Sequence, residues 1–461
     1  MKPSSSQFSR RSFLQAAGLG AMALAGAGVP SSTLAAVRGT SRRFFDIKKI
    51  ERTTVRLPFR EVPKRAMDRE LPHWRYVEVC EVTLGSGAVG LGETLLYYTW
   101  GVPTDADVRR IGGKNAVDLM WDDSLGAGLQ IALFDAVAKT AGVPVHRLLG
   151  QQVHKTTPLS WWNIDTPAAD MASECRLAYD TGYLSYKTKG RPWFDIYEQL
   201  EQSAAVVPAE FKIDMDFNAT LLDADRGMKI IKDLEKYPQV DIYESPIPQE
   251  DIAGNRKIRD ATRVNIAMHY GTPTPRQVVE HGACDGFVVG GGATRTIRAG
   301  QFSEEVDMPF WLQLVGTGIT AAYSLHFGGV LQKARWPAVN CHQLYTHDLL
   351  TKRIEVKKGF AEVPEVPGLG YELDRDALNR FKVAKLKSRP EPDRLMETTF
   401  ADGSKMYTAS DGRVNFMLRP AMAGKMPFYK EGADTKPLPN DGSTRWRRLF
   451  KKAQSGPLVV K

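Results

Sequence analysis

Apolar, strand-like runs alternate with helical stretches through the second part of the chain, and this rhythm restricts the fold more than any other feature. After residue 150 the runs recur about every 25 to 30 residues, the spacing expected of βα units in a parallel sheet. Eight such units favour a closed (β/α) barrel over an open doubly wound sheet, and a barrel occupies roughly 250 residues. The runs lie at 159–162, 184–187, 211–215, 240–243, 264–268 and 286–289, with two weaker ones at 309–314 and 338–341.

The residues in front of this repeat have a different pattern. From 45 to about 94 the sequence is strand-like, with alternating polar and apolar residues at 47–55 and 76–82. A helical stretch begins after Asp123 and Ser124, whose side chains can cap it, and ends at Gly142-Val143-Pro144. Antiparallel strands followed by a helix predict an α+β domain before the barrel.

The first 36 residues are typical of an export signal. Ser9-Arg10-Arg11-Ser12-Phe13-Leu14 precedes an apolar run at 16–29 that is rich in Gly and Ala, and small residues follow at 33–36. The paired arginines resemble a twin-arginine signal. The apolar run is shorter than the roughly twenty residues that a membrane span needs. We therefore expect cleavage near residue 36, a periplasmic or otherwise extracytoplasmic protein, and no transmembrane helix in its mature form.

Composition and charge narrow the class of protein. The chain is 43% hydrophobic and 25% charged, as soluble globular proteins are. Its formal net charge of +9 suits small anionic substrates. No basic stretch interleaved with aromatic residues indicates a nucleic-acid partner. The four cysteines are far apart and form no CxxC pair, which predicts isolated buried thiols (Cys80, Cys175, Cys284 and Cys341).

Charged side chains end three consecutive strands of the predicted barrel. Lys187 and Lys189 close the second strand, Asp216 closes the third, and Glu244 closes the fourth. Side chains two residues apart in a strand point to the same face, so the two lysines share a face. Catalytic residues of such barrels lie at the carboxyl ends of the strands. We therefore expect these four side chains to meet in one site.

These residue types suit the removal of a proton from the carbon next to a carboxylate. Such a proton is very weakly acidic, so an enzyme must stabilise the enediolate that forms and must supply a base. Carboxylates on neighbouring strands can bind a divalent cation that stabilises the enediolate. A lysine beside a second ammonium group and a metal has a lowered pKa and can act as that base.

The motifs resemble those of the mandelate racemase/muconate lactonising group of the enolase superfamily. Lys-x-Lys, Asp-x-Asn and Glu-x-Pro close the second, third and fourth strands in the same order, and the resemblance covers residues 45 to about 380. Further matching pieces are Gly90-Leu91-Gly92-Glu93, Phe134-Asp135, Gly142-Val143-Pro144, His146-Arg147-Leu148-Leu149-Gly150 and Pro367-Gly368-Leu369-Gly370.

The resemblance implies an enolase-type (β/α) barrel with an α+β N-terminal capping domain, and a homo-oligomer. It implies that Lys189 is the base, that Lys187 lowers its pKa, and that Asp216 and Glu244 bind a divalent metal, with Mg²⁺ as the first choice. The expected domains are the capping domain at 43–152, the barrel at 153–345 and a segment completing the cap at 346–386.

Residues 387–461 form an extension beyond the resemblance, and their role is open. The basic stretch 445–452 could contact a partner subunit or an anionic surface, but we expect a solvated tail.

The fifth strand departs from the family pattern, in which a third carboxylate ligand is normal. His269 stands at its end, and three interpretations are open. His269 could bind the metal, which would favour Mn²⁺, Fe²⁺ or Zn²⁺ over Mg²⁺. It could instead act as a catalytic acid or base, or have only a structural role.

The sixth and seventh strands depart from the pattern as well. Gln313 stands where racemases of this group have a histidine, so a second base is missing and racemisation is disfavoured. The glycines at 290–292 could form a nest for an anion or simply allow a tight turn into the next helix. The predicted substrate-binding residues are Asn218, Trp162, Arg191, Gln313 and Glu93.

Dehydration of an acid sugar fits these features best, because it needs only one base. An epimerase or another lyase of the same superfamily is the alternative within this chemistry. A non-catalytic periplasmic binding protein derived from the fold is the alternative from another class, motivated by the unusual fifth and sixth strands. In each case we expect a small carboxylate as the ligand.

Overall fold

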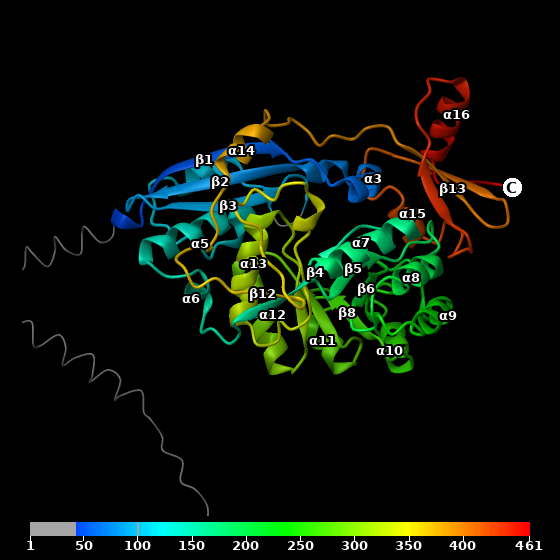
Figure 1. Ribbon diagram of the computed structural model, residues 1–461, viewed down its shortest axis with the longest axis horizontal. Helices are drawn as coiled ribbons and strands as arrows, with labels where there is room; N and C mark the ends of the chain where they lie inside the picture. The colour runs from blue at the N-terminus through cyan, green and yellow to red at the C-terminus, as the bar shows by residue number, and fades with distance from the viewer. Residues whose placement is uncertain (1–42, 99–100) are drawn as a thin grey trace, which may run out of the picture.

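The computed structural model describes residues 43–98 and 101–461, and the predicted export signal lies outside these ranges. Figure 1 shows a capping layer lying over a barrel, with the C-terminal residues packed beside both. Eight parallel strands in sequence order form the barrel wall, with β11 paired to β4. A parallel bridge between Gln313 and Val339 joins the last two strands and closes the ring. The strands are β4 (Thr156–Trp162), β5 (Ser185–Lys189), β6 (Lys212–Asp216), β7 (Val240–Glu244), β8 (Asn265–His269), β9 (Gly286–Val289), β10 (Phe310–Leu312) and β11 (Ala338–Val339).

Helices surround this ring, and the predicted βα alternation is confirmed. Short 3₁₀ helix η3 (His342–Leu344) follows β11, and β12 (Phe360–Glu362) pairs antiparallel with β4. The helices between the strands are α7 (Ala168–Asp180), α8 (Ile196–Ala204), α9 (Ala224–Leu234), α10 (Ile252–Ala261), α11 (Pro275–Glu280), α12 (Ala293–Glu305) and α13 (Gly318–Val330).

The capping layer consists of a three-stranded antiparallel sheet and the buried helix α5 (Ala127–Ala141). The sheet contains β1 (Ile47–Arg56), β2 (Tyr76–Leu84) and β3 (Val89–Leu95). Glycines let α5 approach β3 closely, because a Cβ on Gly92 would lie 2.0 Å from the carbonyl oxygen of Gly128. Asp135 of α5 accepts hydrogen bonds from the backbone N–H of Leu91 and of Leu369. The family-like motifs at 90–93, 134–135 and 367–370 therefore hold the capping layer together.

Helical turns in the capping layer correct one prediction. The segment between β1 and β2 was expected to be strand-like, but it forms α3 (Glu61–Glu70) and the 3₁₀ helix η1 (Pro72–Arg75). Its buried side chains, such as Met67 and Trp74, recur at helical spacing over too few turns to stand out beside the flanking strands. The remaining elements are α4 (Asp105–Ile111), η2 (Asp123–Leu125), α6 (His146–Leu149) and α14 (Arg375–Phe381).

The extension folds into a small module, so the expectation of a solvated tail is wrong. Four antiparallel strands in the order β15-β13-β14-β16 form its sheet. Trp446 of its basic helix is buried against that sheet. A second apolar cluster joins the module to Trp193 and Phe194 of the barrel. The elements are β13 (Leu395–Thr399), β14 (Lys405–Ala409), α15 (Leu418–Met422), β15 (Asp434–Pro437), α16 (Thr444–Ala453) and β16 (Leu458–Val460).

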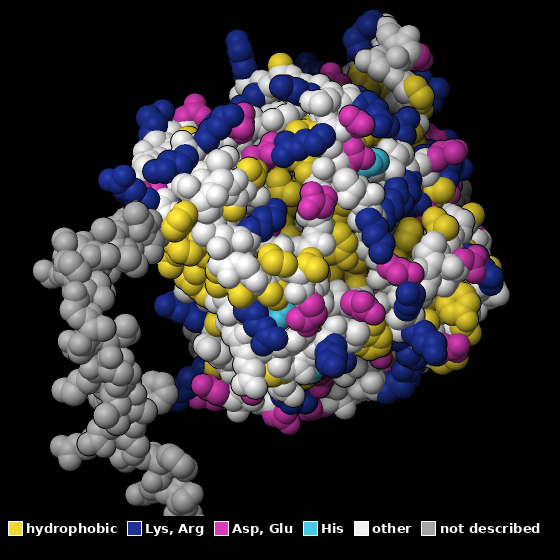
Figure 2. Space-filling model, turned by 60° about the vertical axis from the view of Figure 1, so that its left-hand side comes forward, with side chains coloured by type: hydrophobic (Ala, Val, Ile, Leu, Met, Phe, Trp, Pro, Cys, Tyr) yellow, Lys and Arg dark blue, Asp and Glu magenta, His cyan; other side chains and the backbone are white. Residues whose placement is uncertain are grey.

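The four cysteines are buried free thiols, as predicted. Within the described ranges, no helix is long and apolar enough to span a membrane. On the face in Figure 2, basic and acidic side chains are interspersed.

Candidate active site

A cavity of about 220 Å³ opens at the carboxyl ends of the barrel strands. Its wall comes from three parts of the chain: the barrel, the capping layer and the C-terminal module. It is lined by the cap residues Glu70, Leu71, Trp74 and Tyr98, by the module residues Val414, Asn415 and Leu418, and by the barrel residues Trp162, Ile164, Asp165, Lys189, Arg191, Asp216, Asn218, His269, Gln313, Val315, Val339 and Cys341.

The predicted lysines and carboxylates meet as two ion pairs, one buried and one partly exposed to the cavity. Lys187 pairs with Glu244, and Lys189 pairs with Asp216. The strand register explains this meeting, because Lys189 lies opposite Asp216 and Asp216 lies opposite Glu244 on neighbouring parallel strands. The structure therefore brings together all four residues that the strand ends predicted.

Lys187 lies beneath the cavity rather than on its wall. It is 1% exposed, and its Nζ lies 4.3 Å from the ring centroid of Trp311. Burial alone would raise the pKa of Glu244, but the Lys187 ammonium, with His269 and Lys189, holds that pKa well below its ordinary value. Glu244 is therefore a carboxylate at neutral pH.

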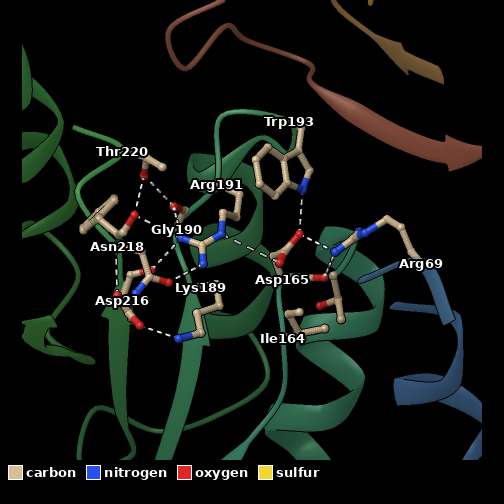
Figure 3. Close-up of polar contacts among 12 residues, drawn as sticks. Arg69, Ile164, Asp165, Lys189, Gly190, Arg191, Trp193, Asp216, Asn218 and Thr220 are labelled. Carbon is tan, nitrogen blue, oxygen red and sulfur yellow. Dashed lines mark hydrogen bonds and ion pairs between the residues drawn. The ribbon is translucent and has the colours of Figure 1, made fainter. Parts of the chain in front are cut away.

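Lys189 reaches the cavity beside Asp216, as Figure 3 shows. Asp216 is fully buried, and its Oδ1 accepts a hydrogen bond of 2.7 Å from the backbone N–H of Asn218. Its Oδ2 contacts Lys189 Nζ. Lys189 must leave this carboxylate before its nitrogen can accept a proton from a molecule in the cavity.

His269 is half exposed at the cavity edge and contacts one of the two carboxylates. Its Nε2 lies 2.8 Å from Glu244 Oε1. Asp216, Glu244 and His269 together offer two carboxylates and one imidazole, donor types that suit a divalent cation. Across residues 43–98 and 101–461, no three His, Cys, Asp or Glu side chains converge on one point. Binding a cation there requires the lysine contacts to open so that the carboxylate oxygens turn towards it.

Arg191 braces the neighbouring loop rather than pointing freely into the cavity (Figure 3). It donates hydrogen bonds to the backbone carbonyls of Asp216 (3.2 Å) and Phe217 (3.0 Å) and to Oδ1 of Asn218 (2.5 Å). Its Nε lies 4.0 Å from Asp165 Oδ1. Arg191 and Asn218 thus form one network that positions the residues after Asp216.

Four of the five residues predicted to bind substrate line the cavity: Trp162, Arg191, Asn218 and Gln313. Glu93 does not, which corrects its assignment. Its carboxylate is fully buried and accepts hydrogen bonds from the backbone N–H of Thr317 (2.6 Å) and Thr320 (2.8 Å). Glu93 therefore caps the start of α13 and joins the capping layer to the barrel.

The glycine run after β9 already has an anion from the chain itself. Asp123 of the cap accepts hydrogen bonds of 3.0 Å from the backbone N–H of Thr294 and of Arg295, at the start of α12. A Cβ on Gly292 would lie 2.3 Å from the Asp123 carboxyl carbon. The glycines thus leave room for the Asp123 carboxylate of the cap. The anion nest and the tight turn into the helix therefore occur together, with the anion supplied by the protein itself.

Sequence reasoning placed Tyr98 in a cap turn that closes over substrate, but it missed the other cap residues and all module residues of the cavity wall. Glu70 lies in a helix that the strand-like pattern obscured, and Leu418 lies in the segment expected to be solvated. A Glu followed by an apolar Leu71 and an aromatic Trp74 was the available signal in the cap, but short helices of this kind carry little periodicity.

Comparison with known proteins identifies the class. Residues 170–377 match the family model described as "Enolase C-terminal domain-like". The chain belongs to the enolase superfamily, whose members typically use a divalent metal and act on carboxylates.

Individual relatives carry different activities. o-Succinylbenzoate synthase from Geobacillus stearothermophilus is 24% identical over 266 residues, covering 55% of this chain and 69% of the relative. Arabinonate dehydratase from Saccharolobus solfataricus is 21% identical over 346 residues, covering 67% of this chain and 91% of the relative. The structure of muconate lactonizing enzyme from Pseudomonas fluorescens, complexed with muconolactone, has a TM-score of 0.60 and 21% identity. It covers 74% of this chain and 100% of that chain, which supports the enolase-type fold.

Proposed function

We propose that the chain is a metal-dependent lyase that removes the proton next to a carboxylate of an acid sugar and then eliminates water. The observation that carries this proposal is the pair of lysine–carboxylate contacts at adjacent strand ends of an enolase-type barrel, with Lys187 buried and Lys189 on the cavity wall. A buried lysine and a partly buried one, held beside two buried carboxylates, are costly to maintain and have little use in a binding protein.

Five barrel residues, on the cavity wall or directly beneath it, have roles in this proposal. Lys189 takes the α-proton onto Nζ, and Lys187 supplies a fixed positive charge behind it. Asp216, Glu244 and His269 are the residues that would hold a divalent metal. When bound, the metal would stabilise the negative charge that develops on the substrate carboxylate. A nitrogen ligand would favour Mn²⁺, Fe²⁺ or Zn²⁺, whereas two carboxylates alone would suit Mg²⁺.

Dehydration is favoured over racemisation because Gln313 lines the cavity where a second base would be needed. An amide cannot accept the α-proton at neutral pH, so exchange from that side lacks a base. The similarity to arabinonate dehydratase also extends over more of this chain than that to o-succinylbenzoate synthase. Both points support a one-base elimination.

Incubation of the purified, Mn²⁺-loaded protein with aldonic and uronic acids in D₂O tests the reaction. We expect a 2-keto acid from at least one acid, detected by NMR. A deuterated epimer without keto acid would assign the alternative epimerase activity. Neither product from any acid would refute proton abstraction and favour the non-catalytic binding protein.

Metal binding has a separate test that does not depend on turnover. We expect Mg²⁺ or Mn²⁺ to raise the melting temperature of the chelator-treated protein, because a ligand that binds only the folded state stabilises it. Asp216→Asn should abolish this increase, and Asp285→Asn, which removes a carboxylate away from the cavity, should retain it. No increase with any divalent ion would contradict the metal site.

We also propose export, on the strength of the paired Arg10 and Arg11 before the apolar run. Replacement of both arginines by lysine should retain the protein in the cytoplasm of a bacterial host, as measured by cell fractionation. Unchanged export would contradict the twin-arginine route.

A further inference from the structure

The cap-side wall of the cavity carries a carboxyl group that the proposed chemistry does not use. Glu70 is the last residue of α3, lines the cavity with Lys189, and is 4% exposed. Among the residues that the structure describes, none donates a hydrogen bond to its Oε2. A buried polar atom without a partner costs free energy, so one on a cavity wall indicates a ligand that completes it.

Three guanidinium groups act on Glu70 electrostatically, yet none of them donates a hydrogen bond to its carboxyl group. They come from the helix of Glu70 itself, from the loop after β5 and from the C-terminal module. Arg69 donates to Asp165. Arg191 donates to the carbonyls of Asp216 and Phe217 and to the side chain of Asn218. Arg394 donates to the Glu391 carboxylate and to the backbone carbonyls of Arg69 and Glu70. Glu70 thus faces positive charge without an ion pair.

This environment keeps a proton on Glu70 near neutral pH. Burial, and to a smaller extent the Asp165 carboxylate, raises its pKa to about 7. Arg69, Arg394 and Arg191 act in the opposite direction but do not cancel the effect of burial. An acid whose pKa lies near the working pH can both donate a proton and regain it.

We propose that Glu70 is the catalytic acid that protonates the departing β-hydroxyl group, an inference that rests on the proposed dehydration. Lys189 lies on the barrel wall and Glu70 on the cap wall, so the base and the acid reach a molecule in this small cavity from different walls. His269 is less suited to the task because its Nε2 already contacts Glu244.

Proton removal, loss of water and tautomerisation follow one another in the proposed reaction. Lys189 Nζ takes the α-proton, and the electron pair of that C–H bond remains on the substrate as an enediolate. When the carboxylate re-forms, the α and β carbons gain a double bond and the β C–O bond breaks. The departing oxygen takes the proton from Glu70 and leaves as water. The enol becomes the 2-keto acid, Glu70 regains a proton from solvent, and Lys189 releases its own.

The C-terminal module holds this acid in place. Arg394 donates a hydrogen bond of 2.7 Å to the backbone carbonyl of Arg69 and one of 3.4 Å to that of Glu70. Its guanidinium also lies 5.0 Å from the ring centroid of Phe416. Arg394 is thus a positioning residue that fixes the end of α3 from outside the capping layer.

Glu70→Gln separates the two halves of the reaction. With the acid that the wild type dehydrates, in D₂O and with Mn²⁺, the variant should exchange its α-proton within a few-fold of the wild-type rate. Keto-acid formation should fall about 10²-fold or more. A β-fluoro analogue should restore elimination, because fluoride leaves without a proton. Glu61→Gln, an exposed residue at the other end of α3, is the matched control and should behave as wild type.

Equal losses of exchange and elimination in Glu70→Gln, or no loss of either, would overturn the inference. Infrared difference spectra of wild type minus Glu70→Gln give a readout independent of turnover. They should show a protonated-carboxyl band at pH 6 that disappears above about pH 7, and absence of that band at pH 6 would also overturn it. If the wild type dehydrates no acid, the proposed function fails first and the role of Glu70 fails with it.

Discussion

Two buried glutamates near the same cavity have pKa values displaced in opposite directions. Glu244, on the barrel side, contacts Lys187 and His269, and these charges hold its pKa well below the ordinary value. Glu70, on the cap side, has three arginines nearby but no ion pair, and burial raises its pKa to about 7. A direct partner therefore decides whether a buried carboxyl group keeps its charge or its proton. A glutamate on the barrel side of the cavity can thus be a fixed anion, while a glutamate on the cap side can be a proton donor.

Loss of the base should have the largest effect on the chemistry of the barrel wall. Lys189→Ala should lower α-proton exchange by about 10²- to 10⁴-fold, the range that a positioned base contributes. Exchange followed by NMR in D₂O measures this. Lys229→Ala, on an exposed position of α9, controls for the loss of a lysine. A wild-type exchange rate in Lys189→Ala would show that Lys189 is not the base.

Breaking the ion pair of Glu244 should destabilise the fold itself. Glu244→Gln leaves Lys187 charged and buried without its carboxylate, which typically costs about 3–5 kcal/mol of unfolding free energy. Urea denaturation measures the change. The double variant Lys187→Met/Glu244→Gln should recover much of it, and a double variant as unstable as the single one would contradict the pairing.

The pH dependence of stability should reveal Glu70. Its pKa is raised from 4.5 to about 7, so the unfolded chain loses this proton near pH 4.5 while the folded chain keeps it to about pH 7. The stability that Glu70 contributes is therefore complete below pH 4.5 and falls as the pH rises to 7. The fall is on the order of 3 kcal/mol.

Glu70→Gln should lack this fall, so the difference in unfolding free energy between the two proteins isolates it. Urea denaturation from pH 4.5 to 8 measures that difference, while Asp214, whose pKa burial raises to about 8, titrates in both proteins. A difference that does not vary with pH would show that folding does not raise the pKa of Glu70.

The smallest expected effect concerns the module wall. Leu418→Ala enlarges the cavity and should raise KM for the preferred acid by about tenfold, because a lost apolar contact is worth about 1–3 kcal/mol. Leu438→Ala, in the separate apolar cluster beneath α16, is the control. Steady-state kinetics measure the change, and an unchanged KM would show that the substrate does not reach this wall.

The barrel wall was predictable because its residues follow from periodicity and strand ends. Parallel strands in register place Lys189, Asp216 and Glu244 side by side, and the sequence shows both the strands and their terminal charges. Gln313 at the seventh strand end was found in the same way.

The other wall was not predictable by such means. Glu70 and Leu418 reach the cavity through the docking of separate layers, which depends on contacts between residues distant in the chain. Glu93 shows the converse limit, because its motif matched the family while its carboxylate caps α13. The roles of His269 and of the metal stay predictions, since a contact with Glu244 suits both a ligand and an ion pair.

The hydrogen bonds of Arg394 have a practical consequence for the design of shortened proteins. A chain ending at residue 386, where family resemblance stops, would look like a complete cap and barrel. It would nevertheless lose Arg394 and its hydrogen bonds to the end of α3. It would also lose Val414, Asn415 and Leu418 of the cavity wall. A protein shortened at the limit of family resemblance would therefore expose the cavity to bulk water on the side of Glu70.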